Sequence, residues 1–577
     1  MSSTVTRSPV LAPGYGDVTV ERDVECRLPD GIVLRADVYR PATETSLPVL
    51  LMRLPYGKTS GGANWGYAHP AWYAQRGYVV AIQDVRGRYA SDGDFTPFVD
   101  ESADGFESVA WAAGLAGSNG KVGMYGFSYP GATQLLAAAA RPQSLAAIAP
   151  GFTSPRFHDG WTYNGGAFSI ASATGWATFL ALDAARRAGD DEAHAALLGA
   201  LGALPGLYWK LPLRDSLPLL DTYAPYFRDW LDHPAYDDYW RATALDEDFS
   251  RIAVPGLHTG GWYDIFHAGV VATFRGIRGV PQKLLLGPWQ HSPWRAIGAA
   301  GRRDAGANEI DEWHLRFFDE VLKGEPQGVF THPCRVFVLD EGWRDLDAWP
   351  PSSSVETEWY LHSGGRANSV YGDGTLSHGA PAGEESADVY LYDPLMPAPS
   401  LGGHSCCTET VAPMGPADQE PYEASKMVLV YTSEPLDREL VLLGDAAVEL
   451  FVSSTAPDTD FTARLCTVDR AGVSTNLKEG ILRARFRDSP AEPEPLVPGE
   501  VYRLRIALGP IGVRLEPGTR VRLDVSSSDF PQWDRNLNTG GPLYTEPATA
   551  AVVATQAVYH DSIRPSRLLL PVDKSLP

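Results

Sequence analysis

The sequence predicts a mostly parallel, doubly wound α/β core that is interrupted by a helical segment and followed by an all-β domain. Short apolar runs alternate with helical stretches over roughly residues 30–150, a pattern typical of βαβ units. Tryptophan, tyrosine, alanine and leucine then dominate to about residue 245, and strict two-residue alternation begins after residue 350. We therefore expect the first part of the core at 1–151, an inserted helical cap at 152–245, the second part of the core at 246–350 and a jelly-roll β-sandwich at 351–577.

The first part of the core contains four apolar runs that we expect to be strands, each bounded by glycine, proline or charged residues. These runs are LPVLLMRL, YVVAIQD, KVGMYG and LAAIAPG. Two segments with helical spacing, ESADGFESVAWAAGL and ATQLLAAAAR, separate the later runs. A strand–helix–strand order of this kind favours a parallel sheet.

The middle of the chain is expected to be helical before the sheet resumes. TFLALDAARRAGDDEAHAALLGALGAL has helical periods, and YFRDWLDHPAYDDYW should be a helix broken at Pro234. IAVPGLHTG and QKLLLGPWQ then return to the strand pattern, and DEWHLRFFDEVLKG should form a late helix.

The last 220 residues or so alternate apolar and polar residues in short runs separated by turn-forming clusters. The clearest are AVELFVSS, ILRARFRD, VYRLRIAL and RVRLDVSSS. Period two is typical of strands with one buried face, so a single all-β domain is expected here.

Composition excludes some classes of partner. The 577 residues carry a formal net charge of −23, which disfavours nucleic acid and anionic membranes. The chain start lacks the apolar core of a signal peptide, and no apolar run is long enough to span a bilayer. Five cysteines without CxxC spacing indicate no zinc site, and we regard adjacent Cys406 and Cys407 as unfavourable for bridging each other. We expect a cytoplasmic protein with reduced thiols and no metal or organic cofactor.

Ser128 lies in a sharp bend between an apolar run and a helix-forming run, in KVGMYGFSYPGATQLL. Gly126 precedes it by two residues and Gly131 follows by three, with Tyr129, which we expect at the surface, beside it. Small neighbours are needed where a nucleophilic serine occupies a tight strand-to-helix turn, the arrangement of the α/β-hydrolase core. The usual GxSxG is not met because Pro130 stands at the second position, so an ordinary structural turn remains the alternative.

The α/β-hydrolase order requires an acid and then a histidine after the serine, each just beyond a strand. Asp264 comes shortly after the strand run IAVPGLHTG, beyond Gly260 and Gly261, and His291 follows KLLLGPWQ. His258 and His267 compete as bases but flank the acid loop, too early for this order. Asp84 precedes the serine and is better explained as structural.

If these groups converge, His291 takes the Ser128 proton and Asp264 orients the imidazole while the hydroxyl attacks an acyl carbonyl. The oxyanion needs hydrogen-bond donors. The Tyr129 amide is one candidate, and the Tyr56 hydroxyl in the loop RLPYGK is the second.

Together, the segments GFSYPG, GGWYDIF, GPWQHS, RLPYGK and SSSDFPQWDRNLNTGG resemble the cocaine esterase family of serine hydrolases. Its relatives are X-prolyl dipeptidyl peptidases, glutaryl-cephalosporin acylases and α-amino-acid ester hydrolases. The resemblance spans nearly the whole chain. It implies Ser128, Asp264 and His291 as the catalytic triad and Tyr56 with the Tyr129 amide as the oxyanion hole. It also implies an acyl pocket where three domains meet, lined by Trp161, Trp176, Phe266, Cys406 and Cys407.

Two departures from the family bear on the substrate. Cys406 and Cys407 stand where the esterase carries a Leu-Phe pair, so a benzoyl preference is not implied. Ile265, Phe266 and His267 follow the acid where relatives that bind an α-amino group carry carboxylates. An ammonium without a carboxylate partner is costly to desolvate, so amino-acid esters are not expected as substrates.

We expect a hydrolase of carboxylic esters with small or medium acyl groups. The alternatives are an amide-cleaving acylase or X-prolyl dipeptidyl peptidase-like enzyme, an acyltransferase using the same triad, and a non-enzymatic protein in which the all-β half binds carbohydrate or protein. The expected partner is a small-molecule ester or amide. We also leave open a homodimer in which edge strands of the β-rich domain pair two subunits.

Overall fold

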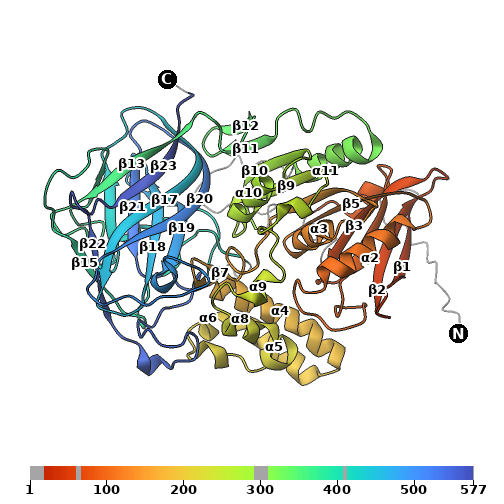
Figure 1. Cartoon of the computed structure of the whole chain (residues 1–577), viewed down its shortest axis with the longest axis horizontal. Coiled ribbons are helices and arrows are strands. Elements are labelled where there is room, and N and C mark those ends of the chain that lie inside the picture. The colour runs from red at the N-terminus through yellow and green to blue at the C-terminus, as the bar shows by residue number, and fades with distance from the viewer. Residues whose placement is uncertain (1–17, 60–66, 292–308, 407–411, 576–577) are drawn as a thin grey trace.

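The computed structural model describes residues 18–59, 67–291, 309–406 and 412–575. Two large mixed sheets dominate these residues, and a helical segment packs between them at one side (Figure 1). The structure confirms the coarse prediction from the sequence, an α/β core followed by a C-terminal all-β domain. Within the described ranges, no helix combines the length and apolarity that crossing a bilayer would need.

The core sheet has ten strands, in the order β1-β2-β4-β3-β5-β6-β9-β10-β11-β12. Its centre from β4 to β11 is parallel, and antiparallel pairs close both edges. The strands are β1 (Val18–Arg27), β2 (Val33–Pro41), β3 (Leu47–Leu54), β4 (Val79–Asp84), β5 (Ser118–Phe127), β6 (Leu145–Gly151), β9 (Gly256–Tyr263), β10 (Gln282–Gln290), β11 (Cys334–Val338) and β12 (Gly342–Leu346).

The central strands of this sheet are almost wholly buried, as continuous apolar runs of parallel sheets require. Helices connect them, and α2 packs on α3, which in turn packs on β5 and β6. These helices are α1 (Pro70–Ala74), α2 (Glu101–Ala113), α3 (Tyr129–Ala139), α10 (His267–Gly276) and α11 (Ile310–Phe318). The sequence pattern does not predict the edge strands β1, β2, β11 and β12 individually.

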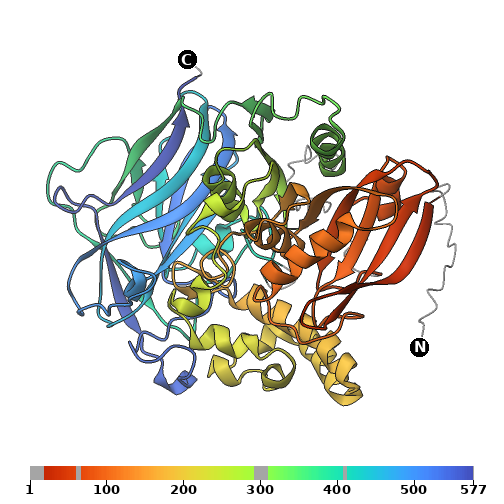
Figure 2. The same ribbon diagram turned by 45° about the vertical axis from the view of Figure 1, so that its right-hand side comes forward.

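The segment between β6 and β9 is mainly helical and lies below both sheets in Figures 1 and 2. After the short hairpin β7 (Tyr163–Asn164) and β8 (Ala167–Phe168) come α4 (Ile170–Ala188), α5 (Asp191–Gly202), α6 (Leu204–Leu207), α7 (Leu220–Tyr223), α8 (Tyr226–Asp232) and α9 (Asp238–Arg241). The expected break near Pro234 is confirmed, because α8 ends at Asp232 and α9 begins at Asp238.

The C-terminal strands form one continuous eleven-stranded ladder in the described residues. Its strands are β13 (Ser354–His362), β14 (Thr375–Ser377), β15 (Asp388–Tyr392), β16 (Leu429–Ser433), β17 (Leu440–Ser454), β18 (Asp460–Val468), β19 (Ser474–Arg483), β20 (Tyr502–Leu515), β21 (Arg520–Ser526), β22 (Ala554–Tyr559) and β23 (Arg567–Asp573), with the short helix α12 (Glu420–Glu423) before β16.

The expected strand ILRARFRD is partly wrong, because β19 ends at Arg483 and a 3₁₀ turn follows over Ala484–Phe486. Buried aspartates explain the turn. The Arg483 guanidinium is hydrogen-bonded to Asp460 and Asp534, and Arg485 Nε donates to Asp458 Oδ2 at 2.7 Å. These ion pairs hold both Arg483 and Arg485 in the interior, and the strand pairing of β19 ends at this point.

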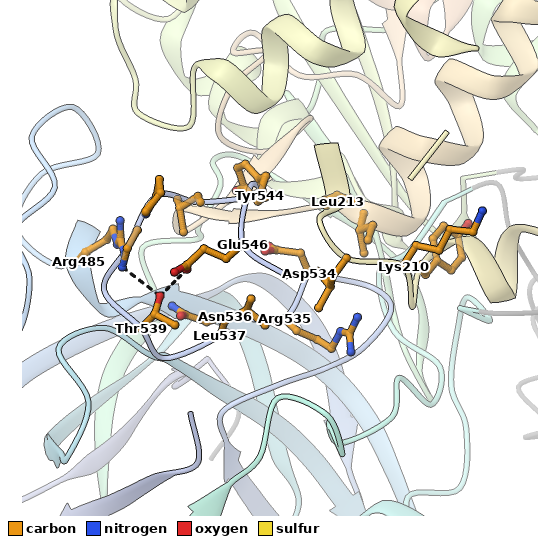
Figure 3. A pocket seen from close by; sticks show the side chains of 16 residues that line it. Lys210, Leu213, Arg485, Asp534, Arg535, Asn536, Leu537, Thr539, Tyr544 and Glu546 are labelled. Carbon is orange, nitrogen blue, oxygen red and sulfur yellow. Dashed lines mark hydrogen bonds between the residues drawn. The ribbon is translucent and has the colours of Figure 1, made fainter. Parts of the chain in front are cut away.

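The α/β core, the helical segment and the all-β domain pack directly against one another. Trp262, on β9 of the core sheet, packs in the same hydrophobic cluster as strands of the all-β domain. Helix α10 contacts both β9 and β20. On the other side, Asp534 accepts a hydrogen bond from the Phe168 amide at 2.7 Å, and Arg535 donates to the Trp209 carbonyl at 3.1 Å. Figure 3 shows this junction, a crevice of about 30 Å³ between the helical segment and a loop of the all-β domain.

Candidate active site

Ser128 occupies a strained turn between β5 and α3. Its φ of 65° lies in the left-handed region that residues with a Cβ seldom adopt. The turn is possible because its neighbours are small. A Cβ at Gly126 would lie 2.5 Å from the Pro130 Cβ, and a Cβ at Gly131 would lie 2.8 Å from the Gly151 carbonyl oxygen. Strain held in place by such close packing is characteristic of functional positions, and it favours the nucleophile elbow over an ordinary turn.

The structure brings Ser128, His291 and Asp264 together. His291 Nε2 is 3.1 Å from Ser128 Oγ, and His291 Nδ1 is 2.7 Å from Asp264 Oδ1. The three residues follow the carboxyl ends of β5, β10 and β9, which lie close together at one edge of the parallel sheet. Asp264 is fully buried, and its loop is closed by a hydrogen bond from its own amide to the Gly261 carbonyl at 3.1 Å.

The competing histidines lie elsewhere. His258 is buried in the middle of β9, where Nε2 contacts Gln282 Oε1 at 2.6 Å and burial lowers its pKa to about 4. His267 begins α10, and its Nδ1 contacts the Asp264 carbonyl oxygen at 2.8 Å, so it supports the acid loop.

Asp84 stabilises the loop that carries Tyr56. Its carboxylate accepts hydrogen bonds from the Lys58 amide at 2.7 Å and from Lys58 Nζ at 3.3 Å. Arg88 adds a second support, since its Nε donates to the Pro55 carbonyl at 3.1 Å. The structural explanation of Asp84 fits these contacts.

Tyr56 is buried beside Ser128. The Trp176 indole donates to the Tyr56 hydroxyl oxygen at 3.1 Å. Burial raises the pKa of Tyr56 to about 12, while hydrogen bonds with Trp176 and Ser128 act in the opposite direction. The hydroxyl therefore remains protonated near neutral pH and can donate to a developing oxyanion.

Tyr129 provides its amide at the first position of α3, one of the N–H groups that have no partner within a helix. The expectation that its side chain lies at the surface is wrong. The ring is fully buried, because its hydroxyl donates to Glu101 Oε1 at 2.8 Å and accepts from the Phe98 amide at 3.0 Å.

Aromatic side chains surround the imidazole and the serine. Phe266 lies 4.3 Å from Trp161 and 5.3 Å from His291 between ring centroids, and Trp161 lies 6.1 Å from Trp176. Sequence reasoning missed Phe98, whose ring lies 5.0 Å from Trp161 and which adopts a positive φ of 72°. Nothing in its local sequence distinguishes it from an ordinary core phenylalanine.

The expectation of reduced thiols is wrong for Cys406, which is buried and disulfide-bonded, whereas Cys26, Cys334 and Cys466 are free. Cys407, the other cysteine expected in the acyl pocket, lies outside the described residues.

Within the described part of the chain, one group of side chains has the spacing of metal ligands: Glu423, Cys466 and Asp524, all buried in the all-β domain. Their chemistry does not fit a metal. Arg522 forms an ion pair with Glu423, and the Cys466 thiol donates to Asp524 at 3.6 Å. Burial raises the pKa of both Cys466 and Asp524, so protons and guanidinium groups already occupy the positions that a cation would need.

Comparisons with known proteins agree with this architecture. The family model described as X-Pro dipeptidyl-peptidase (S15 family) matches residues 30–293, and the model of the X-Pro dipeptidyl-peptidase C-terminal non-catalytic domain matches 328–569. Solved structures with the same fold include an aminopeptidase from a marine sediment Thaumarchaeota archaeon (TM-score 0.79, 23% identity, covering 100% of this chain and 99% of that one) and an α-amino acid ester hydrolase (TM-score 0.77, 23% identity, covering 99% of each).

One curated relative is similar enough in sequence to identify the family to which this chain belongs. Cocaine esterase from Rhodococcus sp. (strain MB1 Bresler) is 36% identical over 575 residues, which is 97% of this chain and 99% of the relative. The elbow at Ser128, the hydrogen-bonded histidine and acid, and full-length similarity lead to the same conclusion: the chain belongs to the cocaine esterase family of serine hydrolases.

Proposed function

We propose that the protein hydrolyses carboxylic esters with small or medium apolar acyl groups through an acyl-enzyme on Ser128. The observation that carries the proposal is the position of His291, which is within hydrogen-bonding distance of Ser128 Oγ on one side and of Asp264 on the other. A histidine held in this way can take the serine proton while the carboxylate stabilises the resulting imidazolium.

The reaction then has two halves. Ser128 Oγ attacks the carbonyl carbon, His291 Nε2 takes the hydroxyl proton, and the Tyr56 hydroxyl with the Tyr129 amide stabilises the oxyanion. His291 returns the proton to the departing alcohol as the C–O bond breaks. Water then attacks the acyl-enzyme with His291 again as the base, which releases the acid and the free serine.

The aromatic surroundings support an apolar acyl group. Trp161, Trp176 and Phe266 lie around the reacting groups, and in the proposal they form one wall of the acyl pocket. The inserted segment between β6 and β9 would act as a cap that supplies both tryptophans, Trp161 before β7 and Trp176 on α4. The all-β domain, of the jelly-roll type, would close the pocket from the other side. Cys406 would contribute to that closure.

The local charges do not favour an α-amino group on the substrate. The positions after Asp264 are Ile265, Phe266 and His267, and His267 is turned toward the Asp264 carbonyl oxygen. The names of the relatives include both ester hydrolases and a dipeptidyl peptidase family, so amide hydrolysis is the second candidate. Acyl transfer, the expected dimer and the expected cytoplasmic location stay predictions.

The test is a set of p-nitrophenyl esters from acetyl to benzoyl, each matched with the p-nitroanilide of the same acid. We expect kcat/KM to be far higher for each ester than for its anilide, and Ser128→Ala to lose several orders of magnitude. Equal or higher rates on the anilides would favour the amide-cleaving alternative. An unchanged rate in Ser128→Ala would refute the proposal.

A further inference from the structure

A cluster of buried charged side chains from the all-β domain contacts the loop that carries Asp264. Its members are Lys478 and Glu479 on β19 and His404 in the loop before α12, and all three are at most 7% exposed. Lys478 Nζ lies 2.8 Å from the Trp262 carbonyl oxygen and 2.9 Å from His404 Nε2. His404 Nε2 also contacts the Trp262 carbonyl oxygen.

The Trp262 carbonyl is available for this contact because of an irregularity in the core sheet. The parallel pairing of β9 with β10 breaks between Gly287 and Gln290, and Trp262 lies opposite the break. Its carbonyl oxygen, only two residues before Asp264, accepts a hydrogen bond from Lys478 of the neighbouring domain. A hydrogen bond at this point fixes the direction in which the chain leaves β9.

The opposite end of the cluster is anchored by Glu479. Its Oε1 contacts His404 Nδ1 at 2.7 Å and accepts from Gln532 Nε2 at 3.1 Å. Although burial acts to raise the pKa of Glu479, the charge and hydrogen bond of His404 lower it to about 2. A buried carboxylate must be paired, and the basic groups that act on Glu479 are His404, Lys478 and Arg464.

Lys478 also acts electrostatically on the catalytic acid. Asp264 Oδ1 is occupied by His291, while the buried Oδ2 has no hydrogen-bond partner among the described residues. Burial lowers the pKa of Lys478 to about 7, and the attraction of Glu479, Asp264 and Asp445 opposes that shift. The charged and titratable groups that face the cluster in the described part of the chain are Asp264 and Tyr263 at the end of β9, His267 on α10, Asp445 on β17, Arg464 on β18 and Asp529 after β21.

We propose that Lys478, held by His404 and Glu479, is a positioning residue for the catalytic acid: it fixes the Trp262 carbonyl two residues before Asp264, and its ammonium group attracts the Asp264 carboxylate. The C-terminal domain, whose matched family model is described as non-catalytic, thereby takes part in the active site. The inference rests on the proposed function, because it assigns Asp264 the role of the acid in the triad.

The test compares Lys478→Met and Lys478→Arg with a matched control, Lys283→Met. Lys283 is also buried, donates to a carbonyl (His332, at 2.6 Å) and has a pKa lowered by burial, but it lies at the start of β10, opposite to the end that carries His291. All variants are full-length chains, assayed on one p-nitrophenyl ester across pH, with thermal unfolding and fluorophosphonate labelling measured in parallel.

We expect Lys478→Met to lower kcat by about 10- to 100-fold with little change in KM, since small displacements of a catalytic group have effects of this size. The acid limb of kcat/KM should move to higher pH by about one unit, because losing a positive charge favours protonation of the neighbouring groups. Lys478→Arg should restore the position of the limb and part of kcat. Lys283→Met should lose thermal stability while keeping kcat and the pH profile.

An unchanged kcat and acid limb in Lys478→Met, or equal changes in Lys283→Met, would overturn the proposal. If Lys478→Met does not fold, His404→Gln separates Glu479 from Lys478 and should lower kcat by about tenfold with the same direction of shift; no change there would also overturn it. A wild-type protein that neither cleaves the ester nor takes the label at Ser128 would instead refute the proposed function.

Discussion

Replacing Tyr56 by phenylalanine tests the proposed oxyanion hole with the removal of one oxygen atom. The Trp176 indole donates to the Tyr56 hydroxyl oxygen at 3.1 Å, and the same hydroxyl also interacts with Ser128, so it lies where it can donate to an oxyanion formed at the serine. The loop is fixed from behind by Asp84 and Arg88, so the phenyl ring should keep its place. The substitution therefore removes a donor with little movement of the backbone.

The expected size follows from the type of contact. Removing one preorganised oxyanion donor lowers kcat by about 100- to 1,000-fold, or about 2.7–4 kcal/mol of transition-state stabilisation. KM should change little, because the donor acts on charge that develops after binding. The Trp176 N–H also loses its acceptor, and because this side chain is only partly buried we expect the free energy of unfolding to fall by about 1 kcal/mol.

The assay is steady-state hydrolysis of a p-nitrophenyl ester, with urea unfolding measured on the same preparations. Tyr226→Phe is the matched control, because Tyr226 is buried nearby and its hydroxyl has no hydrogen-bond partner among the described residues. We expect that control to retain the wild-type kcat. Full activity in Tyr56→Phe, or an equal fall in both variants, would refute the assignment of Tyr56.

Three further predictions concern the acid, the elbow and the response to pH. Asp264→Asn should lower kcat by about 10⁴-fold while Ser128 and His291 remain in place, because the amide no longer holds the imidazole in the required tautomer. A much smaller loss of kcat in steady-state kinetics would indicate that Asp264 is merely structural. Gly126→Ala should destabilise the protein by about 1–3 kcal/mol and reduce activity, because φ at Gly126 is +135° and the new Cβ would meet Pro130. The control Gly199→Ala lies in open space on α5 and should be neutral or stabilising in thermal unfolding. The pKa of Glu479 is lowered from 4.5 to about 2, so the unfolded chain binds more protons between these pH values, and the free energy of unfolding should fall as pH drops from about 4.5 toward 2. Glu479→Gln should flatten this part of the curve of unfolding free energy against pH. An unchanged curve in the variant would count against a paired, charged Glu479.

The sequence predicted much of the site because its main residues follow strands of a parallel sheet. In such a sheet the strand ends β5, β9 and β10 lie at one edge, so the chain order of Ser128, Asp264 and His291 was enough to expect them together. Their catalytic roles stay predictions.

Contacts between distant segments could not be predicted in this way. The Tyr129 ring is buried because Glu101 and the Phe98 amide bind its hydroxyl from an earlier loop and helix. Lys478 reaches the acid loop from a strand more than 200 residues later, and its local pattern is that of any β-strand. Such residues are identified only when the packing of one domain against another is known.

The central claim is that a histidine and an aspartate activate Ser128, and covalent labelling measures this most directly. A fluorophosphonate is incubated with the wild type, Ser128→Ala and His291→Ala, and the adducts are counted by intact mass and mapped to a peptide. The account predicts one adduct on Ser128, none in Ser128→Ala and labelling slower by at least about a thousandfold in His291→Ala. Label on another residue, or an unchanged labelling rate without the imidazole, would contradict it.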